Sequence, residues 1–191
     1  NAPAAAYLDA GRVFVFPHIR EPYTYNTSTY LGMLLSEGKE SPEEIYTFIT
    51  THVAPVISHD LGRYDAFVLT VPPAWGLVRP MLTTKFDELF APRVTGRAFT
   101  SEEIKHAKIV IESDTQYFFN VGVPMTPYAN DGVQCRIPLP ENPGPVALLA
   151  ITYYVIGRIQ AQHPPYFSDN IRTYTTRAQE VFGQPVPVIV E

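Results

Sequence analysis

The longest apolar run in the sequence is Val146-Ala-Leu-Leu-Ala-Ile-Thr-Tyr-Tyr-Val-Ile156. It is rich in β-branched and aromatic residues, and it follows the turn sequence Asn142-Pro143-Gly144. Such side chains pack well on a pleated surface, so the run is predicted to be the central strand of a sheet. It is much shorter than the roughly 20 apolar residues that a membrane-spanning helix needs.

Shorter apolar segments predict further strands on both sides of this run. These are Gly11–Phe16, Thr29–Leu35, Arg63–Val71, Lys108–Ile111, Gln116–Val123 and Val133–Leu139. Asn130-Asp131-Gly132 is predicted to form a hairpin turn, because these residues tolerate positive φ. The 19 prolines fall mainly between the apolar runs, where they end strands and order loops. The pattern predicts a mainly β fold, an antiparallel eight-stranded jelly-roll sandwich with one or two short helices and long loops.

The clearest helix signal is Ser41-Pro-Glu-Glu44. A serine cap, a proline at the first helical position and a glutamate three residues after the cap form a capping box. The helix is predicted to run to about Ala54. Thr100-Ser-Glu-Glu103 repeats this pattern for a short helical turn, and the irregular stretch Ala74–Arg97 is predicted to hold one short helix near Thr84–Leu89.

Length and charge favour one domain that spans residues 1–191, with extended termini. Charged residues make up 17% of the chain, a low share that is expected when partners cover part of the surface. The net charge of −5 argues against a dedicated nucleic-acid-binding surface. The start at Asn1 indicates either processing from a precursor or a trimmed chain.

No motif for catalysis, a cofactor or a metal is found in the sequence. The five histidines, at positions 18, 52, 59, 106 and 163, lack the spacing of metal ligands. His59-Asp60 could orient an imidazole, but a loop pair that caps the next strand is the favoured interpretation. The single cysteine, Cys135, is predicted to be a small buried side chain without catalytic function. Glu43-Glu44 and Glu102-Glu103 are predicted to stabilise helix dipoles.

Basic residues concentrate in and just after the stretch Ala74–Arg97. They are Arg79, Lys85, Arg93, Arg97, Lys105 and Lys108. They could contact phosphates of a nucleic acid. The favoured interpretation is a solvated loop, or arginines that bind carboxylates of a partner subunit. Asn26-Thr27-Ser28 also matches the acceptor pattern for N-glycosylation.

The second half of the chain resembles picornavirus-like capsid proteins. The resemblance rests on a succession of segments: His59-Asp-Leu-Gly-Arg63, Val71-Pro72-Pro73, Lys108–Glu112, Tyr117–Pro124 and Met125-Thr-Pro-Tyr128. It covers about Gly62–Arg158, and it is a pattern of strands and prolines.

The resemblance implies a structural subunit in the icosahedral virion shell of a small non-enveloped RNA virus, cut from a polyprotein. Such a subunit is not an enzyme and holds no cofactor. Its partners would be copies of itself and sibling capsid proteins, with weak contact to genomic RNA and no stable membrane insertion. The residues predicted to contact other subunits are Trp75, Leu77, Met81, Phe86, Phe90 and Val188.

Two other classes of function remain open from the residues alone. One is a β-sandwich module that binds a carbohydrate or a peptide on exposed aromatic side chains such as Tyr23, Tyr25 and Trp75. The other is an enzyme whose site is assembled from residues scattered along the sequence.

Overall fold

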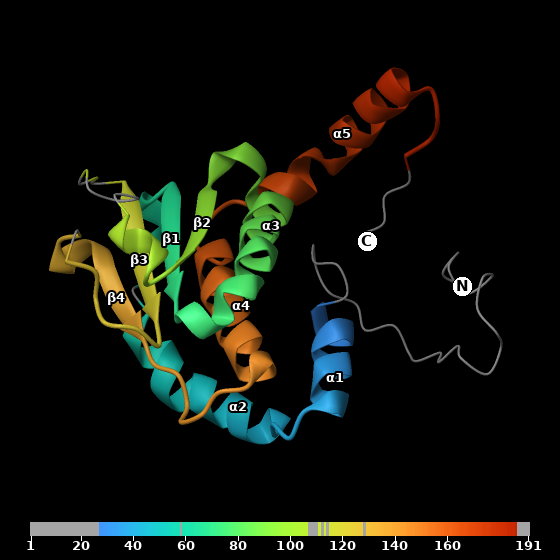
Figure 1. Cartoon of the computed structure of the whole chain (residues 1–191). Helices are drawn as coiled ribbons and strands as arrows, with labels where there is room; N and C mark the ends of the chain where they lie inside the picture. The colour runs from blue at the N-terminus through green and yellow to red at the C-terminus, as the bar shows by residue number, and fades with distance from the viewer. Residues whose placement is uncertain are drawn as a thin grey trace.

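A parallel four-stranded β-sheet lies at the centre of the computed structural model, which describes residues 27–57, 59–106, 111, 113, 115–127 and 129–186 (Figure 1). The strands are β1 (Ala66–Val71), β2 (Thr95–Thr100), β3 (Gln116–Val121) and β4 (Gln134–Ile137). Their order in the sheet is β2-β1-β3-β4, and every neighbouring pair is parallel. The antiparallel jelly roll predicted from the sequence is therefore wrong.

The described residues also form five α-helices. They are α1 (Thr27–Glu37), α2 (Pro42–Phe48), α3 (Arg79–Phe90), α4 (Pro145–Gln160) and α5 (Tyr166–Phe182). Helices α3 and α4 cover one face of the sheet, which we call the helical face (Figure 1). On the opposite face, which we call the open face, Ile104 and Ala129 pack on the sheet; they come from the connections after β2 and β3.

The two central strands, β1 and β3, are buried on both sides of the sheet. Five consecutive residues of each strand are buried. Continuous apolar strands of this kind are typical of parallel sheets with both faces covered. The irregular stretch Ala74–Arg97 contains the crossover that parallel pairing requires, with α3 between β1 and β2 in the chain order, and its last residues begin β2.

The run Val146–Ile156 forms α4 and is not a strand. Pro145 occupies the first helical position, where its fixed φ suits the start of a helix. The carboxylate of Glu40 then accepts hydrogen bonds from the amide nitrogens of Val146 (2.9 Å) and Ala147 (2.8 Å). The helix packs against the sheet, α1 and α3, so apolar side chains are needed around most of its circumference. Burial overrides the strand preference of its β-branched residues.

One further strand prediction and one turn prediction also fail. Thr29–Leu35 lies within α1, whose residues Leu31, Leu34 and Leu35 pack on the core at helical spacing. Asn130-Asp131-Gly132 does not form a hairpin, because the strands on both sides of it, β3 and β4, pair in parallel. The predicted strand Gly11–Phe16 lies outside the described residues, as do Tyr23, Tyr25 and Asn26.

The capping prediction at Ser41 is confirmed. Ser41 Oγ accepts a hydrogen bond of 3.2 Å from the amide nitrogen of Glu44. The helical path continues beyond α2 through Ile49–Val53 and Ala54–Val56, so it ends close to the predicted Ala54. Ile45, Ile49 and Val53 bury one face of this path in the core.

Replacing Ser41 with alanine is expected to lower the free energy of unfolding by about 1 kcal/mol, because the amide of Glu44 loses its partner. Urea denaturation monitored by circular dichroism measures this loss. Ser36→Ala is the matched control, because Ser36 Oγ donates only to the carbonyl of Met33 near the end of α1. An equal effect of both substitutions would contradict a specific cap.

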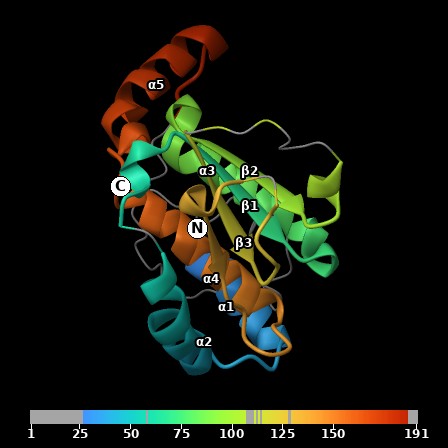
Figure 2. The ribbon, with the colours of Figure 1, turned by 90° about the vertical axis from the view of Figure 1, so that its left-hand side faces the viewer.

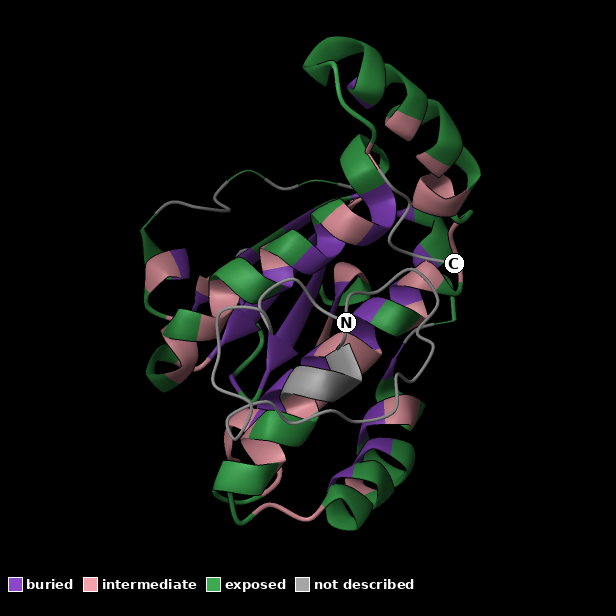
Figure 3. Cartoon of the chain, turned by 90° about the vertical axis from the view of Figure 1, so that its right-hand side faces the viewer, coloured by how far each residue is buried: buried purple, intermediate pink, exposed green. Residues whose placement is uncertain are grey.

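Helix α5 lies at the end of the molecule opposite α1 and α2 (Figure 2). Most of its residues are exposed, including Tyr174, Val181 and Phe182 (Figure 3). None of the helices within the described part of the chain is long and apolar enough to cross a membrane.

Candidate ligand-binding site between the central strands

The topology places a divergence point at the carboxyl ends of β1 and β3. The connection after β1 leads to β2 on one side, whereas the connection after β3 leads to β4 on the other side. Open α/β sheets bind ligands at such switch points, because the two connections separate there. The connections begin at Pro72 and Gly122 respectively.

Thr70 and Asn120 lie side by side at this point. They are register partners on β1 and β3, so both side chains project from the same face of the sheet. This is the open face, which they share with Val68 and Phe118 two residues earlier. Thr70 is 2% exposed and Asn120 is fully buried. Within the described part of the chain, Thr70 Oγ1 and Asn120 Oδ1 have no hydrogen-bond partner.

The orientation of the Asn120 amide is set by Gln134 on β4. Gln134 Oε1 accepts from the amide nitrogen of Thr126 (3.0 Å), and its Nε2 donates to the carbonyls of Thr126 (3.1 Å) and Ala129 (2.7 Å). These bonds fix Oε1 as an acceptor, so Asn120 must turn its Nδ2 toward it (3.2 Å). The same Nδ2 also donates to the carbonyl of Cys135 (3.4 Å). Asn120 Oδ1 is left without a partner among the described residues, next to the strand that carries Thr70.

Gly122 directs the chain away from the end of β3. Its φ is +64°, and an added Cβ would lie 2.4 Å from Cδ1 of Leu139. Its amide nitrogen still donates to the carbonyl of Ile137 at 2.8 Å, so the turn stays attached to β4. A larger residue would be strained here, and the connection that Gln134 holds would move.

The polar groups of Thr100 at the end of β2 are hydrogen-bonded, in contrast to Thr70 Oγ1 and Asn120 Oδ1. Glu103 Oε2 accepts from the amide (2.8 Å) and the hydroxyl (3.1 Å) of Thr100, whose Oγ1 accepts in return from the amide of Glu103 (3.2 Å). The capping box predicted at Thr100 is thus confirmed. Arg79 forms an ion pair with Glu103 at 2.6 Å. The charges of Arg79 and Glu103 therefore compensate each other at the carboxyl end of β2.

The residues predicted to contact other subunits are dispersed. Phe86 and Phe90 are each 1% exposed and pack inside the core of the chain itself. Trp75 is partly buried against the same core. Leu77 is 94% exposed and Met81 is 37% exposed. Val188 lies outside the described residues.

Most of the basic residues after Ala74 have partners within the chain. Besides Arg79, Lys85 pairs with Glu88 (2.7 Å) and Lys105 pairs with Glu102 (2.8 Å). Arg93 stacks on the ring of Tyr166 and Arg97 on the ring of Phe99. Lys108 lies outside the described residues. The cluster therefore does not form one continuous basic surface among the residues described.

Neither the His59 ring nor the Cys135 thiol faces the Thr70–Asn120 pair. His59 is exposed, and the adjacent Asp60 forms an ion pair with Arg63 (3.2 Å). Cys135 projects from the helical face, as does its register partner Phe119. Burial raises the pKa of the Cys135 thiol to about 11, and the hydrogen bond with Tyr117 offsets part of that rise. The same burial raises the pKa of Tyr117.

Cys135 is expected to react with iodoacetamide about 100-fold more slowly than an unperturbed thiol at neutral pH. A pKa of about 11 leaves a correspondingly smaller thiolate fraction than the usual value of 9.0. Mass spectrometry of the native protein over time measures the rate, and the urea-unfolded protein provides the reference. Equal rates in the native and unfolded protein would contradict this expectation.

His163 carries another buried atom without a partner among the described residues, Nε2. Burial lowers the pKa of His163, although a backbone hydrogen bond to Leu61 and nearby Asp65 act in the opposite direction. The ring meets the aromatic rings of Phe67 and Phe90 edge-on. Its contact with Phe67 places the ring near the amino end of β1, away from the edge where parallel sheets bind ligands. We therefore place the candidate site at Thr70 and Asn120.

The described residues contain no group of histidine, cysteine, aspartate and glutamate side chains that could hold a metal ion. The sequence matches no protein-family model and shows no significant similarity to a curated protein. The site therefore has to be interpreted from its own geometry. Sequence reasoning missed Thr70, Asn120 and Gln134, although each of the two buried strands carries one polar residue just before its last position.

Proposed function

We propose that this chain binds a small polar molecule at the carboxyl ends of β1 and β3. A hydroxyl or amino group of the ligand would donate a hydrogen bond to Asn120 Oδ1 and exchange one with Thr70 Oγ1. The observation that carries the proposal is the pair of buried, unpartnered oxygens at adjacent positions of the sheet.

An unpaired polar group in a protein interior costs about 1–3 kcal/mol. Such groups are rare, because folded proteins pair nearly all their buried polar atoms. Thr70 Oγ1 and Asn120 Oδ1 lie on neighbouring strands, so one bound molecule would satisfy both oxygens. The four hydrogen bonds made by Gln134 hold Asn120 in the required orientation before any ligand arrives, which lowers the entropic cost of binding.

Few apolar side chains cover the pair on the open face. Its apolar contacts form a small cluster with three buried members, Val68, Ile104 and Phe118, and Ala129 packs at its side. The helical face carries the main core instead.

The geometry favours binding rather than catalysis. Neither Thr70 nor Asn120 has a histidine or a carboxylate hydrogen-bonded to it within the described residues. An activated nucleophile needs such a base. The capsid hypothesis drew its support from a resemblance to jelly rolls, and a parallel sheet provides none of that support. The carbohydrate-binding hypothesis assumed a β-sandwich, which the described residues do not form. Carbohydrates nevertheless carry the hydroxyl donors that the proposed site requires.

Titration of the ¹⁵N-labelled protein with glycerol, D-ribose and ethanolamine tests the proposal. We expect at least one of these donors to shift the side-chain amide signals of Asn120 and Gln134 at millimolar concentrations. The shifts should disappear in Thr70→Val, which keeps the shape of the side chain and removes its hydroxyl. Thr152→Val is the matched control, because its hydroxyl is buried and already bonded within α4. Unchanged spectra with all three donors, or equal binding by Thr70→Val, would refute the proposal.

A further inference from the structure

A complete row of side chains crosses the open face at the level of the candidate site. Phe99, Thr70, Asn120 and Arg136 are consecutive register partners on β2, β1, β3 and β4. Neighbouring strands lie about 4.8 Å apart. The side chain of Arg136 on β4 therefore begins one strand spacing away from Asn120 on β3, whose Oδ1 is unpaired among the described residues. The row thus offers an aromatic ring, a hydroxyl, an amide oxygen and a cation in a fixed order.

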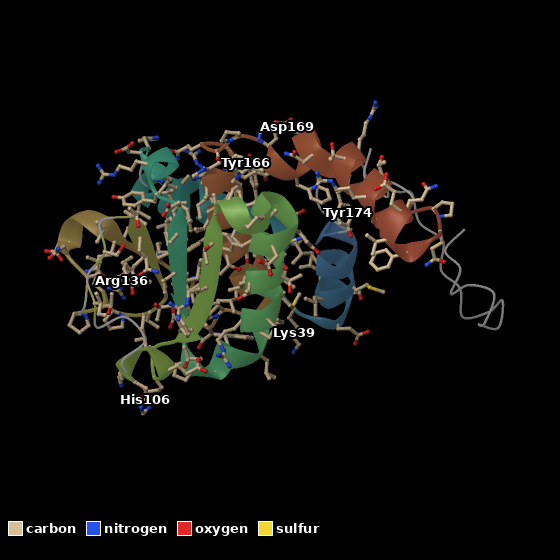
Figure 4. The ribbon with its side chains drawn as sticks, turned by 90° about the horizontal axis from the view of Figure 1, so that it is seen from above. Lys39, His106, Arg136, Tyr166, Asp169 and Tyr174 are labelled. Atoms are coloured by element: carbon tan, nitrogen blue, oxygen red, sulfur yellow. The ribbon has the colours of Figure 1, made fainter. Side chains whose placement is uncertain are left out.

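Arg136 is exposed at the end of this row. Figure 4 shows it on the side of the sheet away from α3. Among the described residues, no carboxylate lies within ion-pair distance of its guanidinium. An arginine side chain is long enough to reach across one strand spacing, and its planar donors suit a carboxylate or a phosphate. Arg136 is therefore available to a ligand that rests on Asn120.

A second guanidinium stands at the opposite side of the open face. Arg97 lies two residues before Phe99 on β2, so it projects from the same face, and its guanidinium stacks 4.8 Å from the centre of the Phe99 ring. It also has no ion-pair partner among the residues that the structure describes. Two cations without a carboxylate partner on one face contrast with the net charge of −5 of the chain. The local field at this face favours an anion.

We infer that the ligand is a small anion that carries a hydroxyl or amino group close to its charged end, and that Arg136 binds the charged end. This inference rests on the proposed function. The donor must reach Thr70 and Asn120 while the anion meets Arg136 on the next strand, so the two groups are separated by only a few bonds. Hydroxy acids and phosphate esters of small polyols share this chemistry.

Isothermal titration calorimetry with four probes tests the inference. Glycerate and glycerol 3-phosphate carry both groups, glycerol lacks the anion, and propionate lacks the hydroxyls. We expect glycerate or glycerol 3-phosphate to bind about 10- to 100-fold more tightly than glycerol, the factor that charge-assisted hydrogen bonds provide. The comparison of the two anions distinguishes a carboxylate ligand from a phosphate ligand. Propionate should not bind measurably.

Arg136→Gln should reduce the affinity for the preferred anion about 10- to 100-fold, to the level of glycerol, without changing the free energy of unfolding. Arg136→Lys should recover part of this loss, because it restores the charge. Arg172→Gln on α5 is the control and should bind as the wild type does.

Equal binding of glycerol and the anions, or unchanged affinity in Arg136→Gln, would overturn the anion inference and leave the proposed function standing. Absence of binding by all four probes would also overturn it, while the titration with neutral donors decides the proposed function separately. Anion binding that Thr70→Val does not weaken would overturn both.

Discussion

Replacing Gly96 with alanine is expected to lower the free energy of unfolding by about 3 kcal/mol or more. Gly96 lies on β2, and the ring of Phe86 on α3 packs directly over it. An added Cβ would lie 1.9 Å from Cγ of that ring. Phe86 is 1% exposed and stacks with Phe67, so it has no space into which to move. The whole of α3 would have to shift from the sheet.

Urea denaturation measures this loss, and Gly157→Ala provides the matched control. Gly157 lies inside α4 with open space around its missing Cβ. Alanine there should raise the free energy of unfolding by up to about 1 kcal/mol, because it removes the entropic cost of a helical glycine. A loss below about 0.5 kcal/mol for Gly96→Ala would contradict the placement of α3 on this face.

Replacing Gln134 with leucine is expected to lower the free energy of unfolding by about 3 kcal/mol or more. The substitution leaves the amide and the carbonyl of Thr126, the carbonyl of Ala129 and Nδ2 of Asn120 with fewer partners. Each buried group left unpaired costs about 1–3 kcal/mol. The connection 122–133 should also lose its anchor, which hydrogen exchange at the amide of Thr126 measures.

Gln116→Leu is the matched control for Gln134→Leu. Gln116 is partly exposed at the start of β3 and forms none of these bonds. Its substitution should change the free energy of unfolding by no more than about 0.5 kcal/mol. If Gln134→Leu were equally mild, the network that orients Asn120 would not exist as described.

The sequence predicted local signals well and long-range pairing poorly. The caps at Ser41 and Thr100 are contained within four residues each, and both are confirmed. Two of the central strands, at Ala66–Val71 and Gln116–Val121, were also predicted near their actual bounds. The parallel pairing of these strands was not predicted, because an apolar run does not indicate the direction of the strand beside it.

The prediction for Val146–Ile156 failed because its decisive partner is remote. Glu40 stabilises the start of α4 from more than one hundred residues away. A buried helix and a buried strand of this length have the same apolar composition, so periodicity could not distinguish them. Once this run was taken as a central strand, a sandwich of antiparallel strands followed. The crossover was then interpreted as a surface excursion with one short helix near Thr84–Leu89, a segment that lies within α3.

The candidate site was not predicted because its residues are chemically ordinary. Thr70 and Asn120 lie 50 positions apart, and only parallel pairing of β1 with β3 brings them together. A single threonine or asparagine in an apolar strand is usually satisfied by a neighbour. What marks this pair is the absence of a partner for each oxygen within the described structure, a property that appears only when the surroundings are known.

The most direct test of the site compares Thr70→Val with Thr152→Val in the free energy of unfolding without ligand. Both threonines are almost fully buried, but only the hydroxyl of Thr152 is hydrogen-bonded, to the carbonyl of Leu148 at 2.8 Å. Removing an unpaired hydroxyl should raise the free energy of unfolding by about 1 kcal/mol, whereas removing a paired one should lower it by about 1 kcal/mol. If Thr70→Val lowered the free energy of unfolding as much as Thr152→Val does, the hydroxyl of Thr70 would already be hydrogen-bonded in the free protein. The proposed ligand site between β1 and β3 would then not exist.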